Sequence, residues 1–285
     1  MAHGNWEVLK CLLMQLDTPA FDIFLHVNAA VKEFPKAALQ GCVGCAHLHF
    51  VHRVKVGYCD YSMVKAVMSL FQEATACHHD YYHLVSGADL MIKSRIEFLT
   101  FFERNAGQEF VGFSSSFQPE RVLFRNFFTA WGRQKSPFWS KTFIKLRKWL
   151  IAIQRQIRLQ KHFPAELTPR KGTDWYSITH RAALLLVEKE PEFRRHFYHA
   201  FCPTEFLLQT ILGNSDEFRE CFYSPNAMEN FQCARTIDWL RGQPYIFRQE
   251  DFELLVQSPG MFARKFDENV DMRIARQLCE YVCRH

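Results

Sequence analysis

Short apolar runs with the alternation of strands are separated along the chain by longer segments with the periodicity of helices. Strands are predicted at 21–27, 47–56, 81–86, 109–113, 172–178 and 235–239. Helices are predicted at about 6–15 after Asn5, 62–73, onward from Ser94, 180–189, 191–199 and 203–212, with two more closing the chain. Repeated strand–helix units predict an α/β fold, with a mostly parallel sheet and helices on both faces.

In such a sheet, ligands bind beyond the carboxyl ends of the strands. Asn28 and the turn Ser86–Asp89 follow two predicted strands and are therefore candidate site positions.

The composition is that of a folded protein with a substantial core. Of 285 residues 48% are apolar and 28 are Phe, which excludes a disordered chain. The longest apolar run, Ala182–Val187, is far shorter than the roughly 18–20 residues of a membrane span, and no signal peptide opens the chain. The ten scattered Cys are therefore expected to be free thiols, and the protein to be cytoplasmic.

The positive charge is concentrated in one segment. Residues 133–161 hold nine Lys/Arg and no acidic residue, and without these nine the net charge falls from +5 to −4. This distribution disfavours a uniformly basic nucleic-acid-binding surface. Within the segment, an apolar stripe at helical spacing leaves the Lys residues on another face, which predicts an amphipathic helix. Residues 138–161 could contact an anionic membrane, with an ordinary surface helix as the alternative.

Several common motifs are missing from the chain. It contains no G-x-G-x-x-G, P-loop or G-x-S-x-G, which disfavours dinucleotide, ATP and hydrolase chemistry. Cys42 and Cys45 followed by His47 and His49 could begin a zinc site, but a second suitably spaced pair is lacking.

Four blocks in order resemble glycosyltransferase family 14, the core-2/I-branching β-1,6-N-acetylglucosaminyltransferases and peptide O-xylosyltransferases, in their bacterial form. LVSGADLMIKS (84–94) resembles the family's S-G-x-D-x-P-I-K-S turn, and KGTDWYSITH (171–180) its K-G-S-x-W-x-S-L-T segment. CPTEFLLQTIL (202–212) is similar to P-D-E-x-x-x-Q-T, and FARKFDENVD (262–271) to F-A-x-K-F-D. The resemblance extends over nearly the whole chain.

This resemblance implies a GT-A type, Rossmann-like fold and inverting transfer from a UDP-sugar to a hydroxyl of a glycan or lipid-linked glycan. The catalytic base would be Glu205, the Glu of the P-D-E block. Metal and cofactor are not expected, since no Asp-x-Asp occurs and family 14 is metal-independent. Basic side chains replace the ion at the leaving diphosphate: Lys265, together with Arg241 or its rival Arg264.

Further roles follow by matching positions. Asn28 stands where the family has Asp, near the nucleotide, and Asp89 matches the Asp of the S-G-x-D turn. Lys93 matches the Lys of that block, and Trp175 could stack on a sugar or pack in the core. Together with Asp89, these two are the candidate substrate-binding residues.

The first residues, Met1-Ala2-His3, resemble the interior of the family's opening A-Y-L-I-x-A-H, so that a first strand is expected to be missing. One domain is predicted, with a nucleotide-binding half (1–113), a basic helical insertion (114–170) and an acceptor and catalytic half (171–285). The competing functions are a non-catalytic sugar-nucleotide- or carbohydrate-binding module and a membrane or RNA adaptor. Of these classes, the sequence favours the enzyme, peripheral on the inner membrane and without a nucleic-acid partner.

Overall fold

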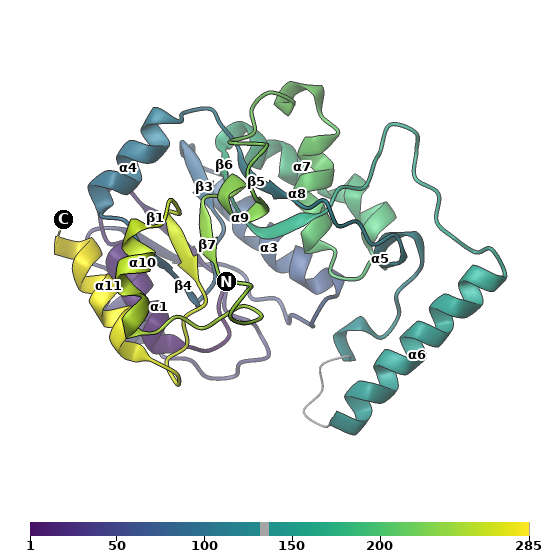
Figure 1. Cartoon of the computed structure of the whole chain (residues 1–285), viewed down its shortest axis with the longest axis horizontal. Helices are drawn as coiled ribbons and strands as arrows, with labels where there is room; N and C mark the ends of the chain where they lie inside the picture. The colour runs from purple at the N-terminus through teal and green to yellow at the C-terminus, as the bar shows by residue number, and fades with distance from the viewer. Residues whose placement is uncertain (132–136, 285) are drawn as a thin grey trace.

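The computed structural model describes residues 1–131 and 137–284 (Figure 1). Its helices are α1 (Trp6–Gln15), α2 (Lys36–Gln40), α3 (Tyr61–Ala74), α4 (Arg95–Arg104), α5 (Glu120–Leu123), α6 (Pro137–Gln156), α7 (His180–Phe197), α8 (Thr204–Gly213), α9 (Glu229–Gln232), α10 (Phe252–Gln257) and α11 (Met272–Arg284), with 3-10 turns η1 (Thr129–Trp131), η2 (Asp216–Phe218) and η3 (Gln249–Asp251). Its strands are β1 (Asp22–Leu25), β2 (His47–Phe50), β3 (Tyr81–His83), β4 (Asp89–Met91), β5 (Phe110–Phe113), β6 (Gly172–Thr179), β7 (Arg235–Ile237) and β8 (Phe262–Arg264). The predicted α/β class is confirmed.

The described strands form three small sheets whose pairing is more mixed than the sequence predicted. Strand β1 pairs in parallel with β2. Strand β6 lies between β3 and β5 and is antiparallel to both. Strand β8 lies between β4 and β7, antiparallel to the first and parallel to the second. Strands β4 and β8 were not predicted, because their residues, DLM and FAR, show no alternation of apolar and polar positions.

Two local predictions were wrong. The helices expected on either side of Pro191 are one continuous helix, α7, in which Phe193 and Phe197 stack at 4.1 Å and are buried. The free energy gained by burying these two rings outweighs the free energy lost with the backbone hydrogen bond that Pro191 cannot make. Asn5 precedes α1 but makes no capping hydrogen bond; its amide instead donates to the carbonyls of Gly87 and Phe266.

Two apolar clusters hold the molecule together. One packs α1 and α11 against β4 and β8, and includes Leu12, Leu278 and Phe262. The other packs α3, α7 and α8 against β6, and includes Phe71 and Leu208. The second cluster supports the strand and helix that carry the KGTDW and PTE blocks, so it fixes their relative position.

A cavity of about 1120 Å³ separates the small sheets at β1 and β3. Its lining is largely apolar and includes Leu25 of β1 and Tyr82 of β3. At one end of the cavity, residues 1–2 form hydrogen bonds both to the segment after β1 and to the segment after β3. Ala2 N–H donates to His26, and the Met1 amino group donates to Val85, at 2.8 and 2.9 Å. The cavity therefore lies between β1 and β3, beside the first residues of the chain.

Helix α6 confirms the predicted amphipathic helix and lies at the edge of the molecule in Figure 1. Two basic residues of the predicted basic segment, Arg133 and Lys135, lie outside the described residues. Within residues 1–131 and 137–284, no helix has the length and apolar character needed to cross a membrane.

Candidate active site

Glu205 lies in the first turn of α8, a helix that is hydrogen-bonded to the backbone of two strands. The amide of Gln209 donates to the carbonyl of Gly112 on β5 at 3.1 Å and to that of Thr173 on β6 at 2.8 Å. A Cβ on Gly172 would lie 1.8 Å from the Gly112 carbonyl oxygen, so glycine is required at this strand crossing. Gly172 thus lets β5 and β6 approach closely, and Gln209 joins both strands to α8.

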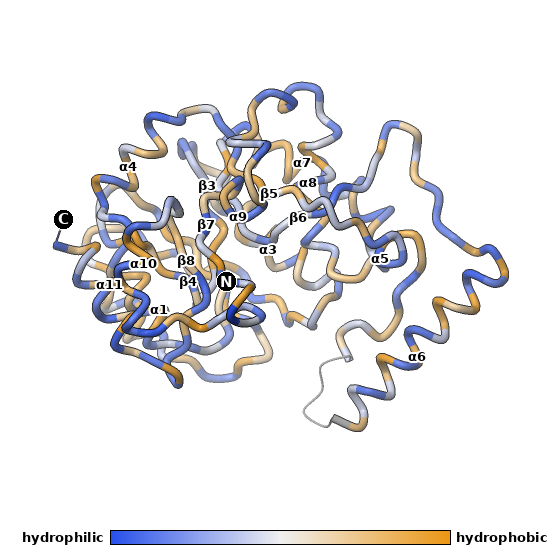
Figure 2. Tube along the Cα trace, in the orientation of Figure 1, coloured by the Kyte–Doolittle hydropathy of each residue, from blue (hydrophilic) through white to orange (hydrophobic). Residues whose placement is uncertain are grey.

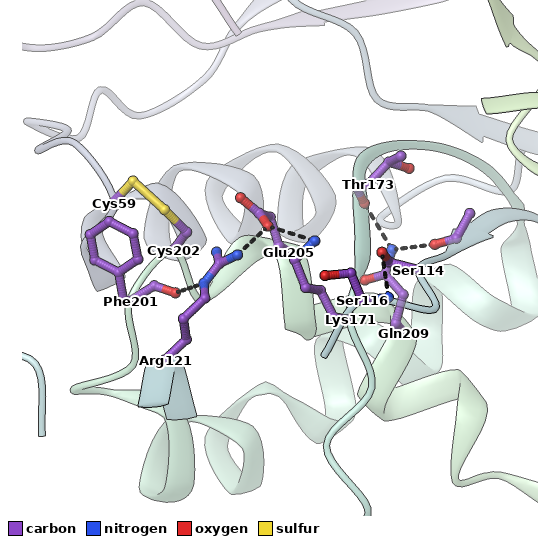
Figure 3. Close-up of polar contacts among 11 residues, drawn as sticks. Cys59, Ser114, Ser116, Arg121, Lys171, Thr173, Phe201, Cys202, Glu205 and Gln209 are labelled. Carbon is purple, nitrogen blue, oxygen red and sulfur yellow. Dashed lines mark hydrogen bonds and ion pairs between the residues drawn. A yellow bond between two sulfur atoms is a disulfide. The ribbon is translucent and has the colours of Figure 1, made fainter. Parts of the chain in front are cut away.

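Two cations hold the Glu205 carboxylate (Figure 3). The Arg121 guanidinium lies 2.9 Å from Oε2, and the Lys171 ammonium 3.4 Å from the same oxygen. Among the described residues, Oε1 has no hydrogen bond or ion pair. Glu205 is about one-quarter exposed, so one carboxylate oxygen is fixed in position while the other is open to a hydroxyl.

A second carboxyl group, that of Asp174 on β6, lies beside this site. Burial, reinforced by the negative charge of Glu205, raises the pKa of Asp174 to about 6, whereas Thr204, Arg264 and Arg121 oppose the increase. Its Oδ1 is buried without a hydrogen-bond partner among the described residues. Asp174 is therefore electrostatically linked to the Glu205 cluster on one side and to Arg264 on the other.

Arg264 brings together two of the predicted site residues. Its guanidinium stacks on the Trp175 ring at 3.6 Å from the ring centre and lies 3.4 Å from Asp89 Oδ1. Its Nε is buried with neither a hydrogen bond nor an ion pair among the described residues, and its Nη1, the atom nearest Asp89, makes no hydrogen bond. Trp175 therefore presents one face to a cation, and Arg264 retains hydrogen-bonding capacity for an anion.

The two other predicted cations differ in their surroundings. The Arg241 guanidinium forms ion pairs with Asp238 and Asp251 at 2.5 and 2.7 Å, and these carboxylates raise its pKa. Lys265 follows Arg264 directly, and within the described part of the chain its ammonium has no hydrogen bond or ion pair. Of the two rival arginines, Arg264 lies with Trp175 and Asp89, whereas Arg241 holds a loop together.

Asn28 and Lys93 are engaged with nearby backbone. The Asn28 side chain accepts from the N–H groups of Ala30 and Val56 and donates to the Val56 carbonyl, which fixes the loop after β2. The Lys93 ammonium donates to the carbonyl of Val256 at the end of α10. Neither side chain contacts Glu205 or Arg264 among the described residues.

The expectation of ten free thiols was wrong for two cysteines. Cys59, which precedes α3, and Cys202, which precedes the PTE turn, form a disulfide across 143 residues of sequence. The Cys202 N–H also donates to the Cys59 carbonyl at 3.0 Å. These bonds attach the start of α8, and with it Glu205, to the start of α3.

Three residues of this site were not predicted. Lys171 and Asp174 lie inside the KGTDW block, next to the matched Gly172 and Trp175, so their charges were an available signal. Arg121 has no such signal, because nothing in its local sequence distinguishes it from a surface arginine.

The described residues contain no group of three or more His, Cys, Asp or Glu side chains arranged to hold a metal ion. In the segment considered for zinc, His47 lies 3.0 Å from the Asp22 carboxylate, and His49 stacks on Phe24 with ring centres 4.8 Å apart. These two histidines of β2 therefore contact side chains of β1 and help to hold the two strands together.

A sequence model of the Core-2/I-branching enzyme family matches residues 1–253. The chain belongs to this family. The matched range contains the blocks of Asp89, Trp175 and Glu205, whereas the block of Arg264 and Lys265 lies beyond it. Membership identifies the chain as a glycosyltransferase, which confirms the predicted enzyme class.

Comparison with solved structures finds similarity to mouse xyloside xylosyltransferase 1 in its apo form, at 12% identity and a TM-score of 0.34. The similarity covers 91% of this chain and 92% of that one. Comparison with curated proteins finds no match.

Proposed function

We propose that this Core-2/I-branching family member transfers a sugar from a UDP-sugar to a hydroxyl of a glycan or lipid-linked glycan, with inversion and without a metal ion. N-acetylglucosamine is the sugar we favour, followed by xylose. The observation that carries the proposal is the Glu205 carboxylate, held through Oε2 by Arg121 and Lys171 and open at Oε1. A fixed carboxylate with one open oxygen has the geometry of a general base.

In the proposed reaction, Glu205 Oε1 takes the proton of the acceptor hydroxyl. The acceptor oxygen forms its bond to the anomeric carbon while the bond from that carbon to the UDP oxygen breaks, and the electron pair leaves with UDP. A single displacement of this kind inverts the anomeric configuration. The product proton remains on Glu205 until solvent takes it.

Charge develops on the diphosphate as UDP leaves. We assign its neutralisation to Lys265, whose ammonium has no partner among the described residues, and to Arg264, which has buried nitrogens without hydrogen bonds. Cations fixed in position stabilise a leaving diphosphate as a metal ion would. Trp175, stacked on Arg264, would face the sugar, and Asp89 would orient Arg264.

Replacement of Glu205 by Gln tests the assigned base. It keeps the shape of the side chain and removes proton uptake, so kcat for UDP release should fall on the order of 10² to 10⁴-fold. The assay follows UDP release from UDP-N-acetylglucosamine and UDP-xylose with a panel of saccharide acceptors. Calorimetry should show unchanged UDP binding.

Glu229→Gln is the matched control, because burial and the nearby charges of Lys171 and Glu205 also act on this carboxyl group. Its activity should stay within a few-fold of the unchanged protein. Full activity of the Glu205→Gln protein would refute the assigned base. Tight UDP binding without turnover of either donor would instead favour the non-catalytic binding module.

A further inference from the structure

Helix α6 carries large apolar side chains and lysines together on its outward face. Phe138 is 70% exposed and Trp149 is 59% exposed. At about 3.6 residues per turn, both lie near Lys145 on the side of the helix opposite Arg147 and Ile151. Figure 2 shows that hydrophobic and hydrophilic residues alternate along this helix. Such large exposed apolar side chains are unusual on a surface that has no partner.

Contacts of the inner face of α6 with the rest of the protein fix the orientation of the helix. The Arg147 guanidinium lies 4.2 Å from the centre of the Phe201 ring and donates to the Asn126 side chain at 2.8 Å. Gln154 exchanges two hydrogen bonds with the backbone of Arg125, at 2.9 and 3.0 Å. The exposed side chains are therefore presented by an anchored helix.

An aromatic cluster extends the apolar surface at the amino end of α6. Phe143 lies 4.8 Å from Trp131, 5.9 Å from Phe128 and 6.2 Å from Trp139, measured between ring centres, and Trp139 lies 5.6 Å from Phe138. Trp131 and Trp139 are each about half exposed. Phe and Trp side chains of this kind are favoured at the boundary between lipid headgroups and acyl chains.

The charge beside these aromatic side chains is positive. Lys141, Lys145 and Lys148 are exposed, and within the described part of the chain none of them forms an ion pair. Helix α6 contains no acidic residue. Arg155 of α6 forms an ion pair with the carboxylate of Glu120 on α5.

We infer that the outward face of α6, with the aromatic cluster, docks on the surface of a bilayer that contains anionic lipids. Aromatic side chains enter the headgroup region while lysines meet lipid phosphates, a combination that strengthens binding beyond either contribution alone. The exposed aliphatic side chains Ile157 and Leu159 favour lipid over nucleic acid, since they cannot stack on bases as aromatic rings do. The inference is independent of the proposed function.

Vesicle flotation of the full chain tests this inference. Vesicles of phosphatidylcholine and phosphatidylglycerol should carry the protein to the top of the gradient, whereas phosphatidylcholine alone should carry much less. Replacing Lys141, Lys145 and Lys148 by Gln should weaken binding to the anionic vesicles on the order of 100-fold. Replacing Phe138, Trp139 and Trp149 by Ser should weaken it by roughly tenfold or more.

The matched control replaces Lys32, Lys65 and Lys189, which are exposed elsewhere, by Gln. It removes the same charge and should float like the unchanged protein. Equal losses for the two lysine variants would overturn the inference, because net charge alone would then explain the binding. A folded, unchanged protein that does not float with anionic vesicles, or that binds single-stranded RNA in preference to them, would overturn it as well.

Discussion

At the scale of single residues, the partners of each side chain distinguish roles that the sequence left open. Arg241 and Arg264 were rivals because the resemblance left either of them as the second cation beside Lys265. The two carboxylates around Arg241 occupy its guanidinium, whereas Arg264 stacks on Trp175 and retains buried nitrogens without hydrogen bonds. A linear motif cannot make this distinction, because the partners of Arg241 are Asp238 and, in η3, Asp251, whereas those of Arg264 come from β4 and β6.

Asp174 makes the stability of the fold depend on pH. Its pKa is raised from 3.8 in the unfolded chain to about 6, so the folded state binds the proton more tightly. This contribution to stability is complete below about pH 4 and is lost as the pH rises through about 6. Ionised Asp174 therefore destabilises the native state at neutral pH.

Replacing Asp174 by Asn should raise the free energy of unfolding at neutral pH by about 2 kcal/mol, because the buried charge is removed. Urea unfolding near pH 4 and pH 7 measures the effect, and the variant should show a smaller loss of stability between them. Asp216→Asn, at a side chain that is 89% exposed, is the control and should change neither value much. Lower stability of the Asp174→Asn protein at neutral pH would contradict the raised pKa.

At the scale of elements, the periodic helices and most of the strands were predicted, and two short strands were missed. Helix α1, helix α3 and the Ser94 capping box of α4 lie within one or two residues of their predicted positions. Strands β4 and β8 were missed because their residues are held by pairing with each other rather than by a local pattern. The break expected at Pro191 was wrong because tertiary burial of α7 overrides a local preference.

The cavity between β1 and β3 leads to a prediction about strand pairing. Its apolar lining and the hydrogen bonds of Met1 and Ala2 on both sides match an extended segment running between the two strands. Burial also lowers the pKa of the Met1 amino group to about 6, with Asp89 partly opposing the decrease. A peptide bond at this position would remove the buried charge.

Adding six apolar, β-branched residues before Met1 should therefore stabilise the fold. Filling the cavity with two or more such side chains should raise the free energy of unfolding by about 2 kcal/mol or more. Thermal and urea unfolding measure it. A chain extended by six Gly and Ser residues is the control for length, and equal stability of the two extended chains would refute the pairing of the added segment with β1 and β3.

At the scale of the whole molecule, the candidate site is assembled from segments far apart in sequence. Strands β4, β6 and β8 bring Asp89, Trp175 and Arg264 together, and α8 places Glu205 beside Lys171. The family resemblance predicted four of these five residues because they lie in motif blocks. It could not predict Arg121 or the Cys59–Cys202 disulfide, since both depend on contacts between segments that share no motif.

The central claim is a UDP site that works without a metal ion, and calorimetric titration of UDP in the presence of EDTA tests it most directly. The unchanged protein should bind UDP under chelation, and Lys265→Ala should bind it at least about tenfold more weakly, because a charge-assisted contact to the diphosphate is lost. Arg241→Ala should retain UDP binding. Absence of binding by the folded, unchanged protein, or binding that chelation abolishes, would contradict the account.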